Sequence, residues 1–371
     1  MTIAAGSVDL RRYSRHLLIP EVGLEGQRKL AAARVLCVGA GGLGSPILAY
    51  LVAAGIGRIG IVDDDVVDVT NLQRQILYAT QDVGKQKAAV AAERLHGLNP
   101  QVAIDAIPVR LNASNARDLI RLYDVVVDGT DTFGSRYVIN DACVLEKKLD
   151  VYGSIFRFDG QISVFGASGG PCYRCLFPEP PPPDTVPTCA EGGVLGVLAG
   201  IVGTWQASET LKLILGIGTP LVGRLLLVDA LDARLREVRI ARDPGCPLCG
   251  DHPTITAVAE LFSERPAPAV PEIDAAELEA RLAAGNILLD VREPHEAVLG
   301  TMEGALAIPA SALEARLHEL DTAKTYVVAC RVGARSLWAI ERLRDAGFGR
   351  LVHLRGGLLS YAARNESFEF F

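Results

Sequence analysis

The sequence predicts an α/β protein with a doubly wound, mostly parallel sheet and a second, smaller domain. Short apolar runs rich in β-branched residues alternate with helical patterns, and most of these runs are separated by enough chain for a crossover helix. The chain has 371 residues, of which 49% are hydrophobic, so it exceeds the size at which one core usually stops growing. We therefore expect at least two domains with large buried cores.

The first domain is expected to contain parallel strands followed by a mixed portion. Four runs predict parallel strands, at 34–38, 58–62, 102–107 and 124–127. Two later runs, at 161–165 and 225–228, flank cysteine-bearing loops and favour a mixed or antiparallel end to the sheet. The apolar stretch 192–205 is too short to span a bilayer and predicts a buried helix.

Proline marks the division of the chain. Pro266, Pro268 and Pro271 alternate with alanines after a charged stretch, which is typical of a linker. We expect a first domain over 1–252, a linker over 253–271 and a second α/β domain over 272–371. The pattern does not explain the last residues, 364–371.

Charge and composition exclude some classes of partner. The formal net charge of −7 argues against a general nucleic-acid or membrane-surface binder. The first ten residues lack a basic region followed by an apolar stretch, so we expect a cytoplasmic protein. In that compartment eight cysteines indicate metal and sulfur chemistry rather than disulfides.

Four of the cysteines form two C-x-x-C pairs, Cys172 with Cys175 and Cys246 with Cys249. Two such pairs supply the four thiolates of a closed, tetrahedral Zn²⁺ site, which leaves no position for substrate and is therefore structural. Two redox dithiols, or cysteines that merely pack, are the alternatives. Zinc is favoured because both pairs lie in turn-like sequence beside proline or glycine.

A glycine-rich loop follows the first predicted strand and precedes a helical run. Its glycines, which let the backbone turn tightly and approach a phosphate, are Gly39, Gly41, Gly42 and Gly44. Asp63 follows at the end of the next strand, where a carboxylate can accept from ribose hydroxyls. The pattern predicts a Rossmann-like nucleotide site. Dinucleotide dehydrogenases share this loop, and a glycine turn used for packing is a further alternative.

Charged residues beyond successive strands narrow this choice. Arg74 lies in the stretch 71–75, which begins with Asn71, and Lys87 lies where a helix is expected to begin. Both side chains are candidates to contact phosphates. Asp131 lies just after the strand expected at 124–127, at the sheet edge where open α/β sheets bind ligands, and a carboxylate there suits Mg²⁺.

In these motifs residues 12–250 resemble the MoeB/ThiF group, adenylyltransferases related to ubiquitin-activating enzymes. The match covers 12–15, the glycine loop, 71–75, Lys87, 128–131 and both cysteine pairs, in the family's order. The resemblance implies that Asp63 holds the ribose, that Arg74 and Lys87 hold the phosphates of ATP, and that Asp131 holds Mg²⁺. It also implies a homodimer in which Arg15 reaches the partner subunit's site.

The implied reaction is adenylation of the C-terminal glycine of a small ubiquitin-like sulfur-carrier protein that ends in Gly-Gly. The carrier carboxylate is ionised near neutral pH and attacks the α-phosphate of ATP without a general base. In related proteins a cysteine at the position of Cys189 receives the activated carrier, so a covalent role is expected for Cys189.

The second domain carries a candidate nucleophile, Cys330, between an expected strand and an expected helix. Backbone N–H groups, a helix N-terminus and two arginines, Arg331 and Arg335, favour its thiolate. A buried, inert cysteine is the alternative.

From about 272 to 363 the chain resembles a rhodanese domain, in which such a cysteine carries a persulfide. The matching segments are 289–293, 304–305, 330–335 and 355–357. The chain departs from many rhodaneses at 300–303, which reads Gly-Thr-Met-Glu ahead of the Gly-Ala pair. Together, the two domains predict consecutive steps: adenylation of a carrier, then attack by the Cys330 persulfide, which leads to a carrier thiocarboxylate.

Two other functions remain open from the sequence. A nicotinamide-dependent oxidoreductase would use the same glycine loop, but it does not account for Arg74, Lys87 and Asp131 together. A non-catalytic scaffold that docks a carrier protein is the second. The sequence does not identify the carrier, its pathway, or whether a cysteine desulfurase or thiosulfate donates the sulfur.

Overall fold

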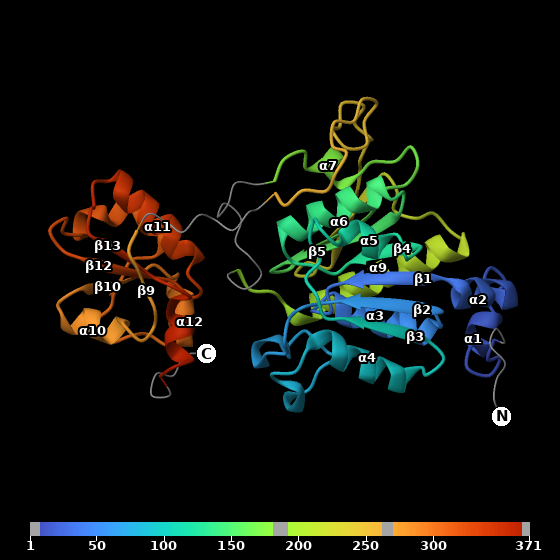
Figure 1. Ribbon diagram of the computed structural model, residues 1–371, viewed down its shortest axis with the longest axis horizontal. Coiled ribbons are helices and arrows are strands. Elements are labelled where there is room, and N and C mark those ends of the chain that lie inside the picture. The colour runs from blue at the N-terminus through green and yellow to red at the C-terminus, as the bar shows by residue number, and fades with distance from the viewer. Residues whose placement is uncertain (1–7, 181–191, 262–269, 366–371) are drawn as a thin grey trace. The chain divides into compact units, whose positions relative to one another are not determined.

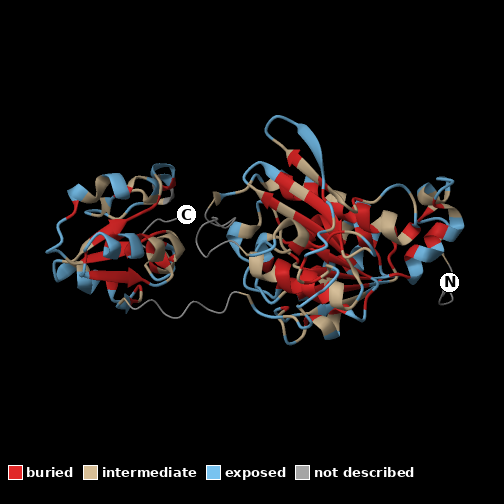
Figure 2. Cartoon of the chain, turned by 90° about the horizontal axis from the view of Figure 1, so that it is seen from above, coloured by how far each residue is buried: buried red, intermediate tan, exposed pale blue. Residues whose placement is uncertain are grey.

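The computed structural model describes residues 8–180, 192–261 and 270–365 (Figure 1). These residues divide into two compact units. The first comprises 8–180 and 192–261, and the second comprises 270–365. Each unit is an α/β fold with its own sheet, which confirms the predicted fold class. In both units the buried residues concentrate on the strands (Figure 2).

The first unit contains an eight-stranded sheet in the order β3-β2-β1-β4-β5-β6-β7-β8. Its strands are β1 (Arg34–Val38), β2 (Arg58–Val62), β3 (Ala103–Ile107), β4 (Val125–Asp128), β5 (Leu149–Phe156), β6 (Asp159–Phe165), β7 (Arg224–Asp229) and β8 (Arg234–Arg239). The first five are parallel, and β6, β7 and β8 are antiparallel to their neighbours, so the expected mixed end is confirmed.

Helices cover both faces of this sheet. They are α1 (Ser14–Leu17), α2 (Gly23–Ala32), α3 (Gly44–Ala54), η1 (Val69–Asn71), η2 (Thr80–Asp82), α4 (Lys87–Leu98), α5 (Ala116–Ile120), α6 (Phe133–Leu145), α7 (Tyr173–Leu176) and α9 (Gly196–Leu215). The helices α3, α4 and α9 lie on one face, and α5 and α6 on the other (Figure 1). Because both faces are covered, successive side chains of β1 pack on opposite faces of the sheet. Val35 packs in the core of the first face and Leu36 in the core of the second.

The sequence pattern does not predict β5 and β8. Asp150 and Gly153 interrupt the apolar run of β5, although both are buried there. Every residue of β8 is exposed, so its sequence lacks the apolar alternation that marks a half-buried strand.

The segment 253–261 packs on the first unit. Ile255, Val258 and Leu261 lie against three of its hydrophobic clusters, and Glu260 Oε1 accepts a hydrogen bond from Ala113 N at 2.7 Å. The linker predicted over 253–271 thus begins with residues that belong to the first unit. Residues 262–269 lie outside the described part of the chain.

The second unit contains a five-stranded parallel sheet in the order β11-β10-β12-β13-β9. Its strands are β9 (Glu272–Ile273), β10 (Ile287–Asp290), β11 (Leu306–Ala307), β12 (Tyr326–Ala329) and β13 (Leu351–Leu354). Its helices are α10 (Leu278–Ala283), η3 (Pro294–Leu299), η4 (Ala310–Ala312), η5 (Glu314–Glu319), α11 (Ala334–Asp345) and α12 (Gly357–Ala362). Among the described residues of both units, no helix is long and apolar enough to cross a membrane.

Helix α9 crosses close to the end of the glycine loop, where α3 begins. Gly203 on α9 lies under the last residue before α3, and a Cβ at Gly203 would lie 2.6 Å from the carbonyl oxygen of Leu43. Gly200 lies one turn earlier on the same helix, and a Cβ there would meet nothing within 4 Å. The absence of a side chain at Gly203 therefore lets α9 approach the loop.

Replacing Gly203 by Ala is expected to lower the free energy of unfolding of the first unit by about 2 kcal/mol, because the added methyl overlaps backbone that cannot move freely. Gly200→Ala is the matched control and should raise it by about 0.5–1 kcal/mol, since alanine favours the helix. Urea denaturation followed by tryptophan fluorescence measures both. Equal effects of the two substitutions would contradict this interpretation of the crossing.

Candidate functional site

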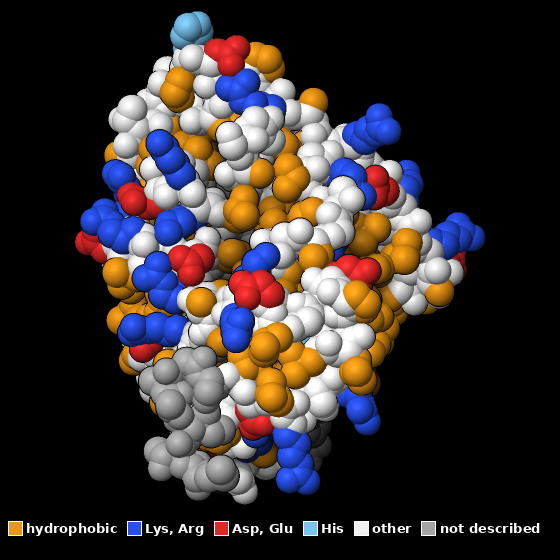
Figure 3. Space-filling view, turned by 90° about the vertical axis from the view of Figure 1, so that its right-hand side faces the viewer, with side chains coloured by type: hydrophobic (Ala, Val, Ile, Leu, Met, Phe, Trp, Pro, Cys, Tyr) orange, Lys and Arg blue, Asp and Glu red, His pale blue; other side chains and the backbone are white. Residues whose placement is uncertain are grey.

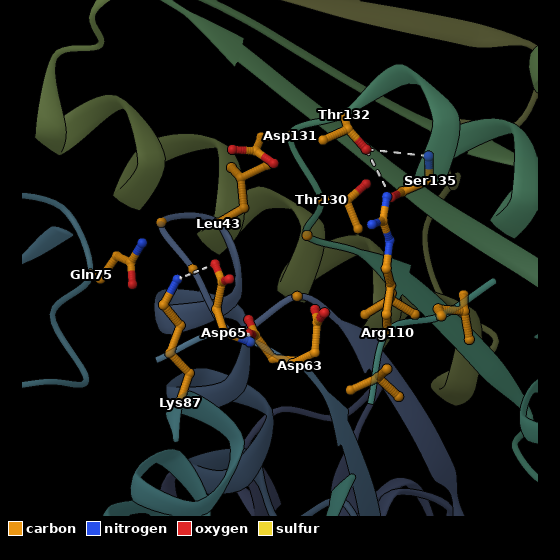
Figure 4. A pocket seen from close by; sticks show the side chains of 18 of the residues that line it. Leu43, Asp63, Asp65, Gln75, Lys87, Arg110, Thr130, Asp131, Thr132 and Ser135 are labelled. Carbon is orange, nitrogen blue, oxygen red and sulfur yellow. Dashed lines mark hydrogen bonds and ion pairs between the residues drawn. The ribbon is translucent and has the colours of Figure 1, made fainter. Parts of the chain in front are cut away.

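A cavity of about 300 Å³ lies at the carboxyl ends of β1, β2 and β4 (Figure 4). It brings together most of the predicted nucleotide-site residues: Gly39, Gly41, Gly42, Asp63, Arg74, Lys87 and Asp131. Parallel strands end at one edge of a sheet, so side chains that follow different strands meet there. Gly44, Asn71 and Arg15 do not line the cavity, and Cys189 lies outside the described residues.

The glycine loop folds back on itself between β1 and α3. A Cβ at Gly44 would lie 2.0 Å from the carbonyl oxygen of Gly39, so the two residues make a backbone contact that tolerates no side chain. Gly39 has φ 91°, in the left-handed region, and a Cβ there would lie 2.8 Å from Gly129 O. Gly44 thus shapes the loop from behind, while Gly41 and Gly42 face the cavity.

Asp63 is tied to the glycine loop. Its Oδ2 accepts a hydrogen bond from Ala40 N at 2.8 Å, and its Oδ1 accepts one from Asp65 N at 2.9 Å. Burial raises the pKa of Asp63, and these two backbone bonds oppose that effect. Each carboxylate oxygen can accept a second hydrogen bond, so Asp63 can still bind a ligand hydroxyl in the cavity.

Lys87 and Arg74 reach the cavity from different directions. Lys87 begins α4, is 5% exposed, and its Nζ lies 2.9 Å from Oδ2 of the exposed Asp65 (Figure 4). Arg74 Nη1 donates to Thr70 O at 3.1 Å. Asn71 closes a capping box with Asp68 in η1, and its carbonyl oxygen accepts from Arg74 N, so Asn71 shapes the turn that carries Arg74.

The turn after β4 is held by Asp128. Its Oδ1 accepts from Thr130 N at 2.8 Å and from Thr130 Oγ1 at 2.6 Å. Burial raises the pKa of Asp128. Asp131 is exposed at the rim of the cavity and follows this turn directly. Asp128 is therefore a structural carboxylate, and Asp131 is available to an ion or ligand.

The cavity also contains residues that the sequence reasoning missed. Arg110 lies shortly after β3, as Asp63 lies after β2, and it lines the cavity. Its place after a predicted strand is the sequence signal that could have identified it. Gln75 is 4% exposed, and its Oε1 has no hydrogen-bond partner among the described residues. Arg136 is buried, with its guanidinium 5.3 Å from the ring centre of Phe133. These side chains add positive charge and hydrogen-bonding groups to the site.

Arg15 lies on α1, which precedes β1 in the chain. This helix lies near the amino ends of the strands, whereas the cavity lies at their carboxyl ends (Figure 1). It is exposed, as are the neighbouring Leu18 and Ile19, at 74% and 45%. Figure 3 views this side of the chain, and orange hydrophobic side chains gather there among charged ones. Within one chain Arg15 does not reach the cavity.

The four cysteines form a compact cluster. Their Sγ atoms lie within 4.8 Å of one another, with 3.9 Å from Cys172 to Cys175, 3.7 Å from Cys172 to Cys246, and 3.3 Å from Cys175 to Cys249. Four sulfurs about 2.3 Å from one tetrahedral zinc ion would be about 3.8 Å apart. The cluster is therefore compatible with a zinc site, and it joins α7 to the segment after β8.

In the second unit Cys330 lies in the loop between β12 and α11. It is buried, and its Sγ accepts a hydrogen bond from Gly333 N at 3.1 Å and lies 3.6 Å from Ser336 Oγ. Arg335 forms two bonds to Glu296, at 2.5 and 2.6 Å, so its charge is balanced by that carboxylate. Arg331 in the same loop is partly exposed.

Comparison with known proteins agrees with the division of the chain into two units. The ThiF family matches residues 13–248, and the rhodanese-like domain matches residues 274–364. The chain is 44% identical over 368 residues to the "Probable adenylyltransferase/sulfurtransferase MoeZ" of Mycobacterium tuberculosis, covering 96% of this chain and 94% of the relative. It is 56% identical over 251 residues to the "Sulfur carrier protein adenylyltransferase" of Thermus thermophilus, covering 66% and 93%.

Solved structures show the same fold at lower identity. The first unit resembles E. coli MccB with ATP, at a TM-score of 0.56 and 24% identity over 66% of this chain and 75% of that chain. The mouse protein "Adenylyltransferase and sulfurtransferase MOCS3" is 44% identical over 88% of this chain and 74% of its own length. The chain therefore belongs to the ThiF family and, with its rhodanese-like domain, to the enzymes that combine adenylyltransferase and sulfurtransferase activities.

Proposed function

We propose that the chain adenylates the C-terminal glycine of a ubiquitin-like sulfur-carrier protein with ATP, which releases pyrophosphate. A persulfide on Cys330 then attacks the acyl-adenylate and expels AMP, and a thiol reductant cleaves the resulting acyl disulfide to release the carrier thiocarboxylate. The observation that carries this proposal is one cavity that gathers a glycine loop, the Asp63 carboxylate and cationic side chains, in a chain that also holds a buried thiol in a rhodanese-like unit. Thiol chemistry of this kind fits the cytoplasm, where cysteines stay reduced.

The first step needs charge stabilisation rather than proton transfer. Arg74 and Lys87 are the cations proposed to stabilise the negative charge that develops around the α-phosphate as the carrier carboxylate attacks and pyrophosphate leaves. Asp131 is proposed to hold Mg²⁺, which would neutralise phosphate charge when bound. A dehydrogenase would not require these charges, and a docking scaffold would not require the cavity.

Pyrophosphate exchange into ATP tests this step. With magnesium and a panel of carriers ending in Gly-Gly, one carrier should stimulate exchange, and Lys87→Ala should lower it by about 100-fold or more, since one cation at a developing charge contributes that much. Lys85→Ala is the matched control: Lys85 lies two residues away, is exposed and pairs with Asp82, so exchange should stay within about twofold.

Bound NAD in the purified protein, with no exchange for any carrier, would favour the oxidoreductase instead. Carrier binding that persists without ATP turnover would favour the scaffold.

The cysteine cluster is proposed to bind Zn²⁺. A closed four-thiolate site would staple α7 to the segment after β8 and supply folding energy rather than catalysis. Elemental analysis should find about one zinc per chain in the wild type and almost none in Cys249→Ser. Thermal denaturation should show a lower melting temperature for Cys249→Ser than for the wild type. Cys143→Ala, which removes a buried thiol on α6, should keep its zinc. A wild-type chain without zinc would overturn the assignment.

We further propose a homodimer in which Arg15 enters the partner subunit's cavity. Its support is the position of Arg15 on an exposed, partly apolar surface away from the cavity of its own chain. Arg15→Ala and Lys87→Ala variants should each lose exchange. After subunit mixing, about a quarter of the wild-type rate should return, because half of the dimers are mixed and each then has one intact site. No recovery from mixtures that have formed mixed dimers would contradict this arrangement.

A further inference from the structure

A line of polar side chains runs from the surface of the second unit to the sulfur of Cys330. Ser336 Oγ lies 3.6 Å from Cys330 Sγ, and His353 Nε2 lies 3.1 Å from that hydroxyl. On the other side of the ring, His353 Nδ1 lies 2.7 Å from Glu272 Oε1. Ser336 and His353 are 0% and 3% exposed, whereas Glu272 is exposed. Two polar side chains are thus buried directly behind the nucleophile.

The order of the strands brings these groups together. His353 lies on β13, between β12, which leads to Cys330, and β9. In the pairing of β13 with β9, His353 lies opposite Glu272. Ser336 lies in the first turn of α11, which follows the Cys330 loop. The line is therefore built from β13, the edge strand β9 and the first turn of α11, and the pairing of the two strands fixes its geometry.

The carbonyl oxygen of Gly333 limits how hydrogens are shared here. A carbonyl has two lone pairs and only accepts. Leu337 N donates to Gly333 O at 3.2 Å as part of α11. Ser336 Oγ and His353 Nε2 face the same oxygen, at 2.7 and 3.1 Å. Because one lone pair remains for two donors, only one of them can occupy it well.

This competition determines how many hydrogen bonds the sulfur of Cys330 can accept. When Cys330 is a neutral thiol, its S–H can donate to Ser336, whose hydroxyl then donates to Gly333. A thiolate or persulfide anion needs donors instead, and Gly333 N supplies one, at 3.1 Å from the sulfur. The Ser336 hydrogen can serve as the second donor if another group occupies the Gly333 carbonyl.

We propose that His353, held by Glu272, is a positioning residue for Cys330: its Nε2–H binds the Gly333 carbonyl and leaves the Ser336 hydroxyl to donate to the anionic sulfur. A ring with hydrogen on both nitrogens meets this requirement, because the Glu272 carboxylate accepts from Nδ1 and balances the charge. The inference rests on the proposed role of Cys330 as the sulfur carrier.

Two amide substitutions separate the two ring nitrogens. A Gln amide reaches the position of Nε2, whereas an Asn amide reaches that of Nδ1. The full-length protein is mixed with thiosulfate, whose outer sulfur the Cys330 thiolate takes while sulfite leaves. The gain in protein mass is followed in a single turnover. His353→Asn should lower the maximal rate about tenfold, as expected for one hydrogen bond to an anion, with the half-saturating thiosulfate concentration unchanged. His353→Gln should stay within about threefold of the wild type.

Ser336→Ala and the double variant with His353→Asn test whether His353 acts through the serine. Both should be as slow as His353→Asn, because the two residues serve one hydrogen bond. Tyr326→Phe is the matched control: it removes another buried hydroxyl, which accepts from Asp321 N, at the other end of β12, and should leave the rate unchanged.

Two results would overturn the inference: equal rates for the Gln and Asn variants, or additive losses in the double variant. Cys330→Ser keeps this outcome separate from failure of the proposed function. If that variant still takes up sulfur, Cys330 is not the carrier, whatever His353 does.

Discussion

The backbone contact between Gly39 and Gly44 is the constraint on which the nucleotide site depends. Because no side chain separates the two residues, the loop turns directly from β1 into α3. The same loop packs against the turn after β4 through Gly39 and Gly129, and it donates Ala40 N to Asp63. One turn thus sets the positions of carboxylates from two other strands. A larger residue at Gly39 or Gly44 would move all of them together.

The candidate sites of the two units lie at similar places in their folds but differ in how their charged groups are surrounded. Each places its chemistry where a parallel strand ends and a helix begins. The first unit leaves charged side chains open to a cavity, with Lys87 and Asp65 paired at its side, which suits the charged phosphates of the ATP proposed to bind there. The second buries the sulfur of Cys330, to which Gly333 N donates and beside which the Ser336 hydroxyl lies, which suits the persulfide anion proposed to form there. A chain with both can activate a carboxylate and supply the sulfur that replaces the nucleotide.

The sequence predicted the parts of the fold that have a clear period. The bounds of β1 and β2 were predicted as observed, because each is a run of five residues with a buried apolar interior. Residues of the cavity were found because they follow successive strands. His353 was not found, since its position depends on the pairing of β13 with β9, which brings together residues 81 positions apart in the sequence. Long-range pairing of this kind leaves no local signal.

Formation of a carrier thiocarboxylate tests the central claim most directly. The full-length protein is incubated with ATP, magnesium, thiosulfate and the carrier that stimulates exchange, and the carrier is then weighed by mass spectrometry. The account predicts a carrier in which sulfur has replaced one carboxylate oxygen, once a reductant has released it from Cys330. An adenylated carrier that accumulates without gaining sulfur would show that the two units do not act in sequence, and would contradict the account.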